Sequence, residues 1–339
     1  MARLGRSHRV GEAILGQRVV VVRRSTVLER HAARPDSGVA KVLSARGVAA
    51  ERLEAAHEQH RESCSRVVDS LRGHGFDVRV VAGLRRRDAR EADLVVTVGG
   101  DGTFLRASHC VEADDRGDGT PMLGINSSPE TSVGFFCAAH AGDLDGLLAR
   151  LRRGEVRSRP LWRMRVSING EPVPDPALND ILVAHRVPAE TTRYTLRVDG
   201  KVQRQKSSGI WVSTAAGSTG AIRSAGGEIL DLDDRRVQFR VRELFPLSVG
   251  DEVPLVGGAV AGALEIESHT AAGVLYVDGA HRKVRFGMGD RLRFETDPHP
   301  LPWLAPSTTD SRRDALRLHS QRVLAAAGLR VDPERPSAS

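Results

Sequence analysis

The sequence predicts an α/β protein with an N-terminal Rossmann-like parallel-sheet domain, a following β-rich domain like a β-sandwich, and a C-terminal helix. Over the first 155 residues short apolar runs alternate with helical patterns, which favours parallel strands joined by right-handed crossovers. After about residue 155, strand-like runs follow one another without helices between them, which favours antiparallel pairing. We therefore expect an α/β domain over 1–155, a β-rich domain over 156–305, and a C-terminal helix with a polar tail over 306–339.

The elements of the first domain follow from the spacing of its apolar residues. The run RVVVVR at 18–23 is typical of a buried strand. Residues 48–72 place apolar side chains on one helical face, and Gly73 and Gly75 favour a helix end just after them. Further strands are expected at 77–81, 93–98 and 121–126, and a second helix at 143–153.

The second half is predicted from alternating patterns and turn signals. The dipeptides Asn169-Gly170, Asp199-Gly200 and Asp278-Gly279 are typical of β-turns. Strands are expected at 162–168, 180–184, 194–198, 210–212, 237–241, 264–267, 273–277 and 291–295, and an amphipathic helix at 307–329.

The charge of the chain suggests an anionic partner but does not favour nucleic acid. The net charge is +7, and only four of the 50 basic residues are lysines. The arginines are scattered along the chain, and aromatic residues make up 4%, too few for the stacking platforms that bind single strands. We expect either a basic surface without function or small anionic substrates, and no nucleic-acid partner.

Cysteine usage and hydropathy exclude several other classes. The three cysteines form no CxxC pair, which argues against a disulfide framework and a cysteine-rich zinc site, and the histidines show no HxxxH or HxH spacing. No apolar run reaches the roughly 18 residues that a membrane helix needs. The first 25 residues are rich in arginine, but a strand pattern begins at 19, so we expect no targeting segment. These observations predict a cytoplasmic protein without a membrane partner.

The stretch most informative about chemistry is GGDGT at 99–103, which follows an apolar strand and precedes a helical pattern. Glycines at the carboxyl end of a strand let the backbone approach a ligand, and a helix N-terminus offers N–H donors to phosphate. Asp101 would repel an anion. It makes chemical sense if it accepts the proton of a hydroxyl that attacks a phosphoryl group, or positions a metal. The alternative is that Asp101 only stabilises a tight turn.

GGDGT after a strand resembles the superfamily of NAD kinases, diacylglycerol-type lipid kinases and phosphofructokinases. Later segments resemble NAD kinases in particular: LGIN with GFF at 123–136, ALND at 177–180, SSGIWVSTAAGSTGAIRSAGG at 207–227, and the turn at 276–279. Lipid kinases share the first motif and lack the segment at 207–227. GINSSPETSVGFF and RQKSSGI are most similar to the mitochondrial-type branch of the family.

This resemblance implies roles for individual residues. Asp101 would be the general base on the adenosine ribose 2′-hydroxyl, with Gly102 contacting the substrate through its backbone. Asn179 and Asp180 would hydrogen-bond the ribose hydroxyls and adenine, because a carboxylate can accept two O–H bonds from a diol. For this pair, a turn after Pro176 is the alternative.

The resemblance also implies contacts with the phosphates and the bases. Lys206 matches a basic position of the family's site, and Arg193 has the spacing of an arginine after the Asn-acid pair. Either side chain could neutralise pyrophosphate, and a surface position without function is an equal alternative for Arg193. The other implied nucleotide-binding residues are Gly99, Gly100, Thr103, Asn126, Ser208, Thr214, Gly217, Ser218, Thr219 and Ser224.

Four positions depart from the family pattern. Most members have Asp at Ser208, Ala at Gly220, Tyr at Ala221 and Gln at Ala280. The mitochondrial-type branch shares the change at Ser208. These differences predict altered contacts with nicotinamide and adenine.

The resemblance implies a kinase that transfers a phosphoryl group from ATP or polyphosphate to the 2′-hydroxyl of NAD or NADH, giving NADP(H). It further implies Mg²⁺ or another divalent cation carried by ATP, no metal site of the protein itself, and a homodimer or homotetramer. Two alternatives stay open. One is a lipid or other small-molecule kinase with the same loop, and the other a non-catalytic NAD(P)(H)-binding sensor, suggested by the departures. Asp101 argues against the sensor, which needs no base.

Overall fold

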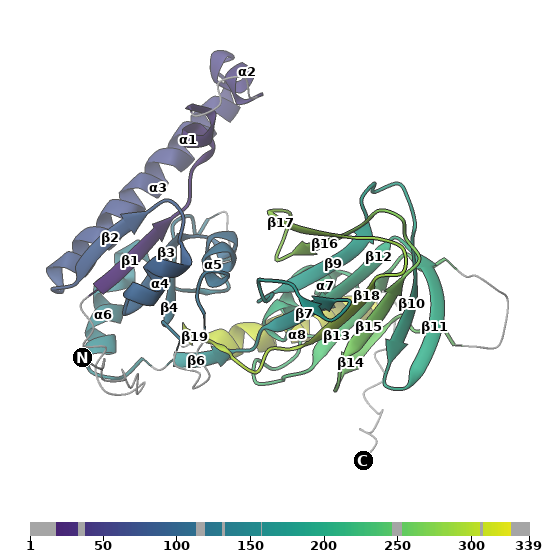
Figure 1. Ribbon diagram of the computed structural model, residues 1–339. Coiled ribbons are helices and arrows are strands. Elements are labelled where there is room, and N and C mark those ends of the chain that lie inside the picture. Colours follow the sequence, from purple (N-terminus) through teal and green to yellow (C-terminus); the bar gives the residue numbers. More distant parts are fainter. Residues whose placement is uncertain are drawn as a thin grey trace.

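The computed structural model describes residues 18–32, 38–112, 119–130, 133–156, 158–245, 253–305 and 308–326. In this part of the chain, an α/β domain lies beside a domain made almost entirely of strands (Figure 1). The fold class predicted from the sequence is confirmed. The Arg-rich stretch before residue 18 and the polar tail after residue 326 lie outside the described residues.

Seven strands form the sheet of the first domain, in the order β2-β1-β3-β4-β19-β6 with β5 beside β4. Their bounds are β1 Arg18–Arg23, β2 Asp77–Val81, β3 Leu94–Gly99, β4 Met122–Asn126, β5 Cys137–His140, β6 Ser158–Leu161 and β19 Leu301–Leu304. Strands β1 to β5 pair in parallel, as the alternation of strand and helix patterns predicts. Their carboxyl ends therefore meet at one edge of the sheet.

Helices cover both faces of this sheet. They are α3 Val48–Gly73, α4 Arg86–Glu91, α5 Asp101–Ser108 and α6 Leu144–Arg152, with a 3₁₀ turn at Ala141–Asp143. Two short helices, α1 Val27–Ala32 and α2 Val39–Ser44, pack against α3 (Figure 1). Successive valines of β1 point to opposite faces: Val20 and Val22 pack with side chains of α4 and α5, whereas Val19 and Val21 pack with α3 and α6. The sheet is buried on both faces, which is why its strands are continuous apolar runs.

The β-rich domain contains two six-stranded sheets, ordered β11-β10-β15-β18-β7-β8 and β14-β13-β12-β9-β16-β17. The bounds of the first are β7 Met164–Ile168, β8 Glu171–Pro172, β10 Thr192–Val198, β11 Lys201–Ser207, β15 Leu264–Ser268 and β18 Arg291–Thr296. Those of the second are β9 Asp180–His185, β12 Gly209–Ser213, β13 Val237–Arg242, β14 Gly257–Val260, β16 Gly273–Val277 and β17 Arg282–Phe286, with η2 Ala216–Thr219 and α7 Ala221–Ser224 after β12. Alternate side chains of both sheets share one buried core, as in a β-sandwich.

The turn signals are confirmed. Asn169, Asp199 and Asp278 have φ of 55°, 46° and 48°, and each is followed by a glycine with positive φ. These are the left-handed conformations that Asn-Gly and Asp-Gly pairs adopt at low cost.

Strands β6 and β19 carry the chain into and out of the β-rich domain, and both belong to the first sheet. Trp303 of β19 pairs in parallel with Met122 of β4, and β6 pairs antiparallel with β19. Both strands fall inside the range 156–305 expected for the second domain. Their short runs, one with Pro160 and one with Pro302, lack the pattern of a buried strand.

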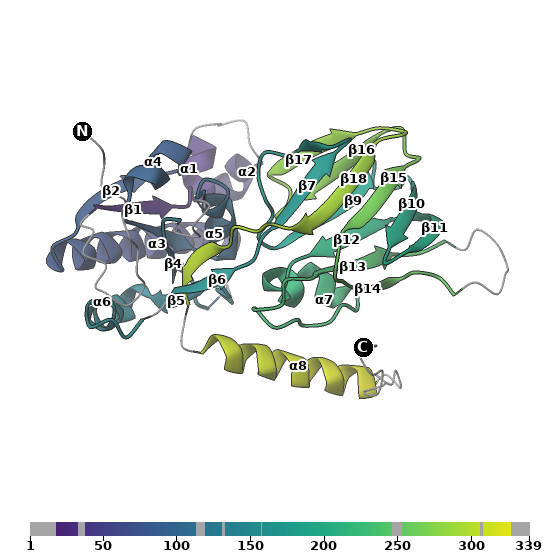
Figure 2. The same ribbon diagram turned by 60° about the horizontal axis from the view of Figure 1, so that its bottom comes forward.

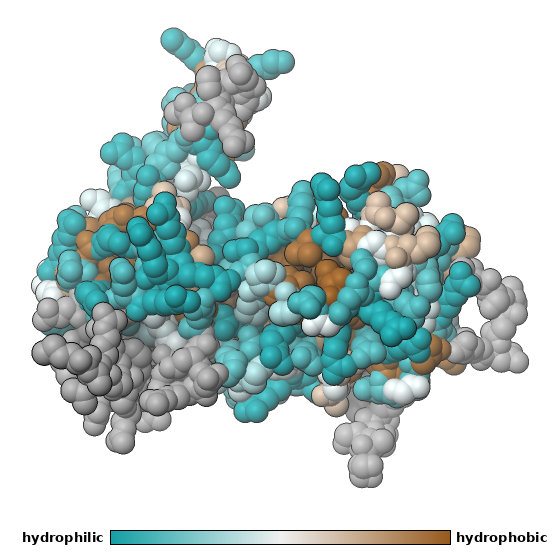
Figure 3. Space-filling model, in the orientation of Figure 1, coloured by the Kyte–Doolittle hydropathy of each residue, from teal (hydrophilic) through white to brown (hydrophobic). Residues whose placement is uncertain are grey.

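The C-terminal helix α8, Thr309–Ala326, lies along the α7 side of the β-rich domain (Figure 2). The face of the molecule in Figure 3 is mostly hydrophilic, in keeping with the charged composition. Among the described helices, none combines the length and the apolar composition that crossing a membrane requires.

Candidate active site

The GGDGT loop joins β3 to α5 at the carboxyl edge of the first sheet. Asp101 is the first residue of α5, and its two carboxylate oxygens accept the backbone N–H groups of Phe135 at 3.0 Å and Phe136 at 2.8 Å. The carboxylate thus stabilises the segment after β4. This structural contact differs from the tight-turn alternative, in which Asp101 would stabilise its own loop. A carboxylate has about four acceptor positions, so two remain for a substrate hydroxyl.

Close packing around the loop explains several of its small residues. A Cβ at Gly99 would overlap the side chain of Thr103, and a Cβ at Gly134 would lie 2.5 Å from Nδ2 of Asn126. Asn126 is buried at the end of β4, and its Oδ1 accepts the N–H of Ser128 at 3.0 Å. Gly102, in contrast, is exposed and has open space where a side chain would lie, which leaves its backbone accessible to a ligand.

The second half of the site begins at Asn179 and Asp180, where β9 starts. Oδ1 of Asp278 accepts the N–H groups of Asn179 at 2.7 Å and Asp180 at 3.1 Å, and its Oδ2 accepts the N–H of Leu178 at 2.8 Å. Asp278 therefore fixes the backbone from which Asn179 and Asp180 project. Nδ2 of Asn179 donates to Asp180 Oδ2 at 3.2 Å, and burial raises the pKa of Asp180 to about 6.

The loop after β12 lies directly against Asn179. A Cβ at Gly217 would overlap the carbonyl oxygen of Asn179, so only glycine fits there. Oγ1 of Thr214 donates to the carbonyl of Leu178 at 2.6 Å and accepts the N–H of Gly217 at 3.2 Å. The motifs ALND and GSTG thus form one unit.

Other predicted residues complete this loop. Oγ of Ser218 donates to the carbonyl of Ala215 at 2.7 Å and accepts the N–H of Leu230 at 3.0 Å. Thr219 ends η2, and Ser224 ends α7.

The two halves of the site meet at a buried contact between the domains. Leu178 and Ala216 belong to the same hydrophobic cluster as Phe104 of α5 and Phe136. At the other end of α5, Nε2 of His109 lies 3.3 Å from Oδ2 of Asp278, with both side chains fully buried.

An arginine of α8 joins the same region. Arg313 is 2% exposed, and its Nη2 donates to the carbonyls of Ala215 at 2.8 Å and Leu230 and to Oγ of Ser218 at 2.9 Å. Its guanidinium carbon lies 5.5 Å from the ring centre of Phe135, whose N–H binds Asp101. Arg313 therefore connects the η2 loop with the segment that holds Asp101.

The structure does not bring Arg193, Lys206 and Ser208 to this place. Arg193 pairs with Lys206 across β10 and β11, and Ser208 precedes β12, whereas Thr214 follows it. The length of β12, about 13 Å at 3.3 Å per residue, separates the two groups. Nζ of Lys206 lies 4.6 Å from the ring centre of Phe245.

Sequence reasoning missed three residues that organise the site: His109, Asp278 and Arg313. Asp278 was identified only as part of a turn, and nothing in the local pattern shows that its side chain reaches back to Leu178. His109 and Arg313 act through contacts with distant segments.

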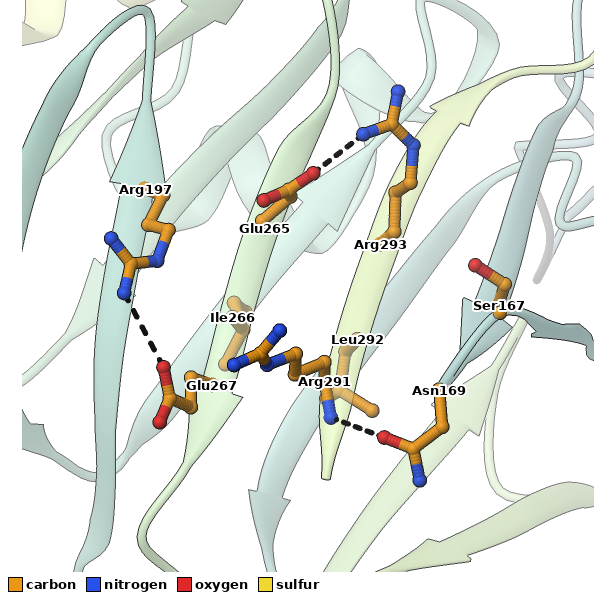
Figure 4. Close-up of a pocket in the computed structure, with 10 residues that line it drawn as sticks. Ser167, Asn169, Arg197, Glu265, Ile266, Glu267, Arg291, Leu292 and Arg293 are labelled. Atoms are coloured by element: carbon orange, nitrogen blue, oxygen red, sulfur yellow. Dashed lines mark hydrogen bonds and ion pairs between the residues drawn. The ribbon is translucent and has the colours of Figure 1, made fainter. Parts of the chain in front are cut away.

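A surface hollow of about 610 Å³ lies elsewhere, on the outer face of β7, β10, β15 and β18 (Figure 4). Two of its three arginines are paired with carboxylates: Arg197 with Glu267 at 3.4 Å, and Arg293 with Glu265 at 2.5 Å. None of the residues predicted for the site lines it. We therefore assign it no part in the chemistry.

The described residues offer a metal ion few protein ligands. Those residues contain no group of three or more His, Cys, Asp or Glu side chains that could hold an ion. Mg²⁺ needs only one or two carboxylates when phosphates and water supply its other ligands. Asp101 is the carboxylate at the sheet edge that suits this arrangement.

Comparisons with known proteins agree with this geometry. The family model of the ATP-NAD kinase N-terminal domain matches residues 17–156. A probable NADH kinase of Oryza sativa subsp. japonica is 34% identical over 240 residues, covering 64% of this chain and 72% of the relative. The mitochondrial NAD kinase 2 of Rattus norvegicus is 29% identical over 256 residues, covering 59% and 58%.

Two solved structures share the fold. The NAD kinase from Archaeoglobus fulgidus in complex with ATP has a TM-score of 0.62 at 23% identity, covering 89% of this chain and 99% of the other. Yeast NADH kinase complexed with NADH has a TM-score of 0.65 at 15% identity, covering 95% and 90%. With the motifs in place around Asp101 and Asp180, these matches lead to one conclusion: the chain belongs to the NAD kinase family.

Proposed function

We propose that this protein transfers a phosphoryl group from ATP or polyphosphate to the 2′-hydroxyl of the adenosine ribose in NAD or NADH, giving NADP(H). The observation that carries the proposal is that the segments of Asp101 and Asp180 meet at one buried contact between the domains. Asp101 stands at the carboxyl edge of the parallel sheet, and Asp180 stands beside the η2 loop. Phe104 follows Asp101 by three residues and Leu178 precedes Asp180 by two, and both share one buried cluster with Ala216 of the η2 loop.

Asp101 and Asp180 would have different roles in the reaction. The ribose 2′-oxygen attacks the terminal phosphorus of the donor, its proton passes to a remaining acceptor position of the Asp101 carboxylate, and the bond from that phosphorus to the bridging oxygen breaks. Asp180, with Asn179, would accept hydrogen bonds from the ribose and hold it in line for attack. A divalent cation would neutralise charge on the donor phosphates.

The other assigned residues would hold the two substrates. Gly99, Gly100, Gly102 and Thr103 would receive the donor phosphates, and Asn126 would support their loop. Thr214, Gly217, Ser218, Thr219 and Ser224 would shape the pocket for the adenosine end of the dinucleotide.

We also propose a homodimer or homotetramer in the cytoplasm. Arg193, Lys206 and Ser208 lie at the far end of β12, so they would serve a nucleotide only if it were bound mainly by a neighbouring subunit. Size-exclusion chromatography with light scattering tests the assembly, and a monomer at micromolar concentration would contradict it.

Product analysis by mass spectrometry tests the function. The pure protein is incubated with Mg²⁺, NAD⁺ or NADH, and ATP or polyphosphate, and we expect NADP⁺ or NADPH. Competing lipid substrates in the ATP reaction test the other kinase class. Saturable dinucleotide binding without a phosphorylated product under any combination would favour the sensor and refute the kinase.

A further inference from the structure

The two basic residues predicted to bind phosphate, Lys206 and Arg193, do not lie beside the GGDGT loop or the η2 loop. Lys206 and Arg193 are on β10 and β11, far along β12 from the η2 loop. The GGDGT loop nevertheless needs a cation nearby, because Asp101 would otherwise repel the donor phosphates at short range. A basic side chain at the carboxyl edge of the first sheet would supply this charge.

Arg24 is that side chain. It follows the last residue of β1, and its N–H donates to the carbonyl of Val98, next to Gly99. Its Nη2 donates to Oγ of Ser128 at 3.3 Å, so the side chain extends from β1 to the segment after β4. Because β3 lies between β1 and β4 in the sheet, this contact crosses the end of β3 where the GGDGT loop begins.

A second hydroxyl lies in the same place. The N–H of Ser127 donates to the carbonyl of Gly99 at 3.4 Å, and its Oγ lies 3.0 Å from Nδ1 of the buried His60. Nε2 of His60 lies 3.1 Å from the carbonyl of Arg24. Burial lowers the pKa of His60 to about 4, so this ring is neutral at physiological pH and contributes no charge.

The guanidinium of Arg24 can form further hydrogen bonds and an ion pair with a ligand. Its Nε is buried and has no hydrogen-bond partner among the described residues, nor does any described carboxylate lie within 4.0 Å of the group. The neighbouring Arg23 is different, since its Nη1 is bound to both oxygens of Glu29 at 2.6 and 2.8 Å. The charge of Arg23 is therefore neutralised by Glu29, whereas no described carboxylate neutralises that of Arg24.

We propose that Arg24, with the hydroxyls of Ser127 and Ser128, forms the subsite for the phosphoanhydride chain of the donor. A guanidinium with two hydroxyls suits phosphate oxygens, which accept several charge-assisted hydrogen bonds at once. The subsite belongs to the donor rather than to the dinucleotide, because it lies on the first domain beside Gly99. The dinucleotide residues are on the second domain. This inference rests on the proposed function and adds a binding residue to it.

Steady-state kinetics of Arg24→Met test the subsite, with Arg23→Met as the matched control. We expect kcat/KM for ATP to fall about tenfold to a hundredfold, with KM for NAD⁺ within about twofold of wild type. Arg24→Lys should lose less activity than Arg24→Met, because lysine keeps the positive charge but lacks the planar set of N–H donors of a guanidinium. Arg23→Met should stay within about threefold of wild type for both substrates.

Inorganic tripolyphosphate, used as an inhibitor competitive with ATP, separates the phosphate chain from the nucleoside. Its inhibition constant should rise in Arg24→Met by about the same factor as KM for ATP. A rise confined to ATP would contradict the assignment to the phosphate chain, and a rise in KM for NAD⁺ instead would place Arg24 with the acceptor. Both results overturn the proposal.

Binding without turnover provides a readout independent of activity. ATP alone should raise the melting temperature of the wild-type protein, and by less in Arg24→Met and Ser128→Ala. If the wild type makes no NADP(H), the proposed function fails. If it does, and Arg24→Met and Ser128→Ala match the wild type in donor kinetics and in the ATP-induced shift, only the subsite fails.

Discussion

Nε2 of His109 lies 3.3 Å from Oδ2 of Asp278, and this contact joins the helix that starts at Asp101 to the turn that holds Asp180. Burial lowers the pKa of His109 to about 4 and raises that of Asp278 to about 7. The histidine is therefore neutral at physiological pH. The contact positions two elements without the strength of a full ion pair.

Asp278→Ala should lower both stability and dinucleotide affinity. It leaves the N–H groups of Leu178, Asn179 and Asp180 without their acceptor, and each unsatisfied buried donor costs about 1–3 kcal/mol. We expect a loss of about 3 kcal/mol in the free energy of unfolding and a raised KM for NAD⁺. Urea unfolding and kinetics measure both. Asp278→Asn should have a stability and a KM between those of wild type and Asp278→Ala, since one oxygen still accepts the N–H groups of Asn179 and Asp180. An unchanged KM in Asp278→Ala would show that the hydrogen bonds of Asp278 have no role in binding.

Asp101→Asn should reduce the rate of NADP⁺ formation by about 10²–10⁴-fold. The structure adds a cost in stability of about 1–2 kcal/mol, because the amide NH₂ would face one of the two N–H donors of Phe135 and Phe136. Asp145→Asn, the same change on the surface of α6, should alter neither quantity. Retention of near-full activity by Asp101→Asn would rule out its role as the base.

Asp180→Asn should stabilise the protein at neutral pH while it weakens activity. The folded pKa of about 6 lies above the ordinary value of 3.8 for an aspartate, so the cost of the buried charge appears as pH rises from about 4 to 6 and stays constant above that. Two pH units correspond to about 3 kcal/mol at most. Melting temperatures at pH 4 and pH 8 check this: the variant should gain several degrees at pH 8 and little at pH 4, whereas Asp145→Asn gains none. An equal gain at both pH values would mean that the carboxylate charge is not the cause.

The sequence predicts the strands and helices well where one pattern decides them. The buried strand at 18–23, the long helix after residue 48 and the three Asp-Gly or Asn-Gly turns all depend on local chemistry, and all are found. Strands β6 and β19 were missed because their membership in the first sheet depends on pairing between segments about 140 residues apart.

In the site too, features set by local sequence were predicted and those set by distant contacts were not. GGDGT, ALND and GSTG were found because their glycines and acids have fixed spacings. The residues that connect them were not, since Asp278 acts 100 residues away from Leu178 and Arg313 acts 95 away from Ser218. Lys206 was assigned to the phosphates because it matches a basic position of the family, and that match does not reveal which end of a strand the residue occupies.

Arg313→Met should lower activity with little loss of stability. Arg313 is 2% exposed, burial lowers its pKa to about 10, and no carboxylate of the described residues lies within 4.0 Å of it. Its Nε and Nη1 have no hydrogen-bond partner in the described part of the chain, so this charge carries a desolvation cost of several kcal/mol that is only partly offset. Ala215 and Ser218 keep other hydrogen bonds when it is removed.

A residue that costs stability and connects the η2 loop to Phe135 is best explained by its effect on the reaction. We expect kcat to fall at least about tenfold in Arg313→Met, with the melting temperature unchanged or raised. Arg317→Met is the matched control, because Arg317 lies one turn further along α8 and is paired with Asp231 and Asp314. It should keep wild-type kcat. A large fall in melting temperature with a proportionate loss of activity would make Arg313 a purely structural residue.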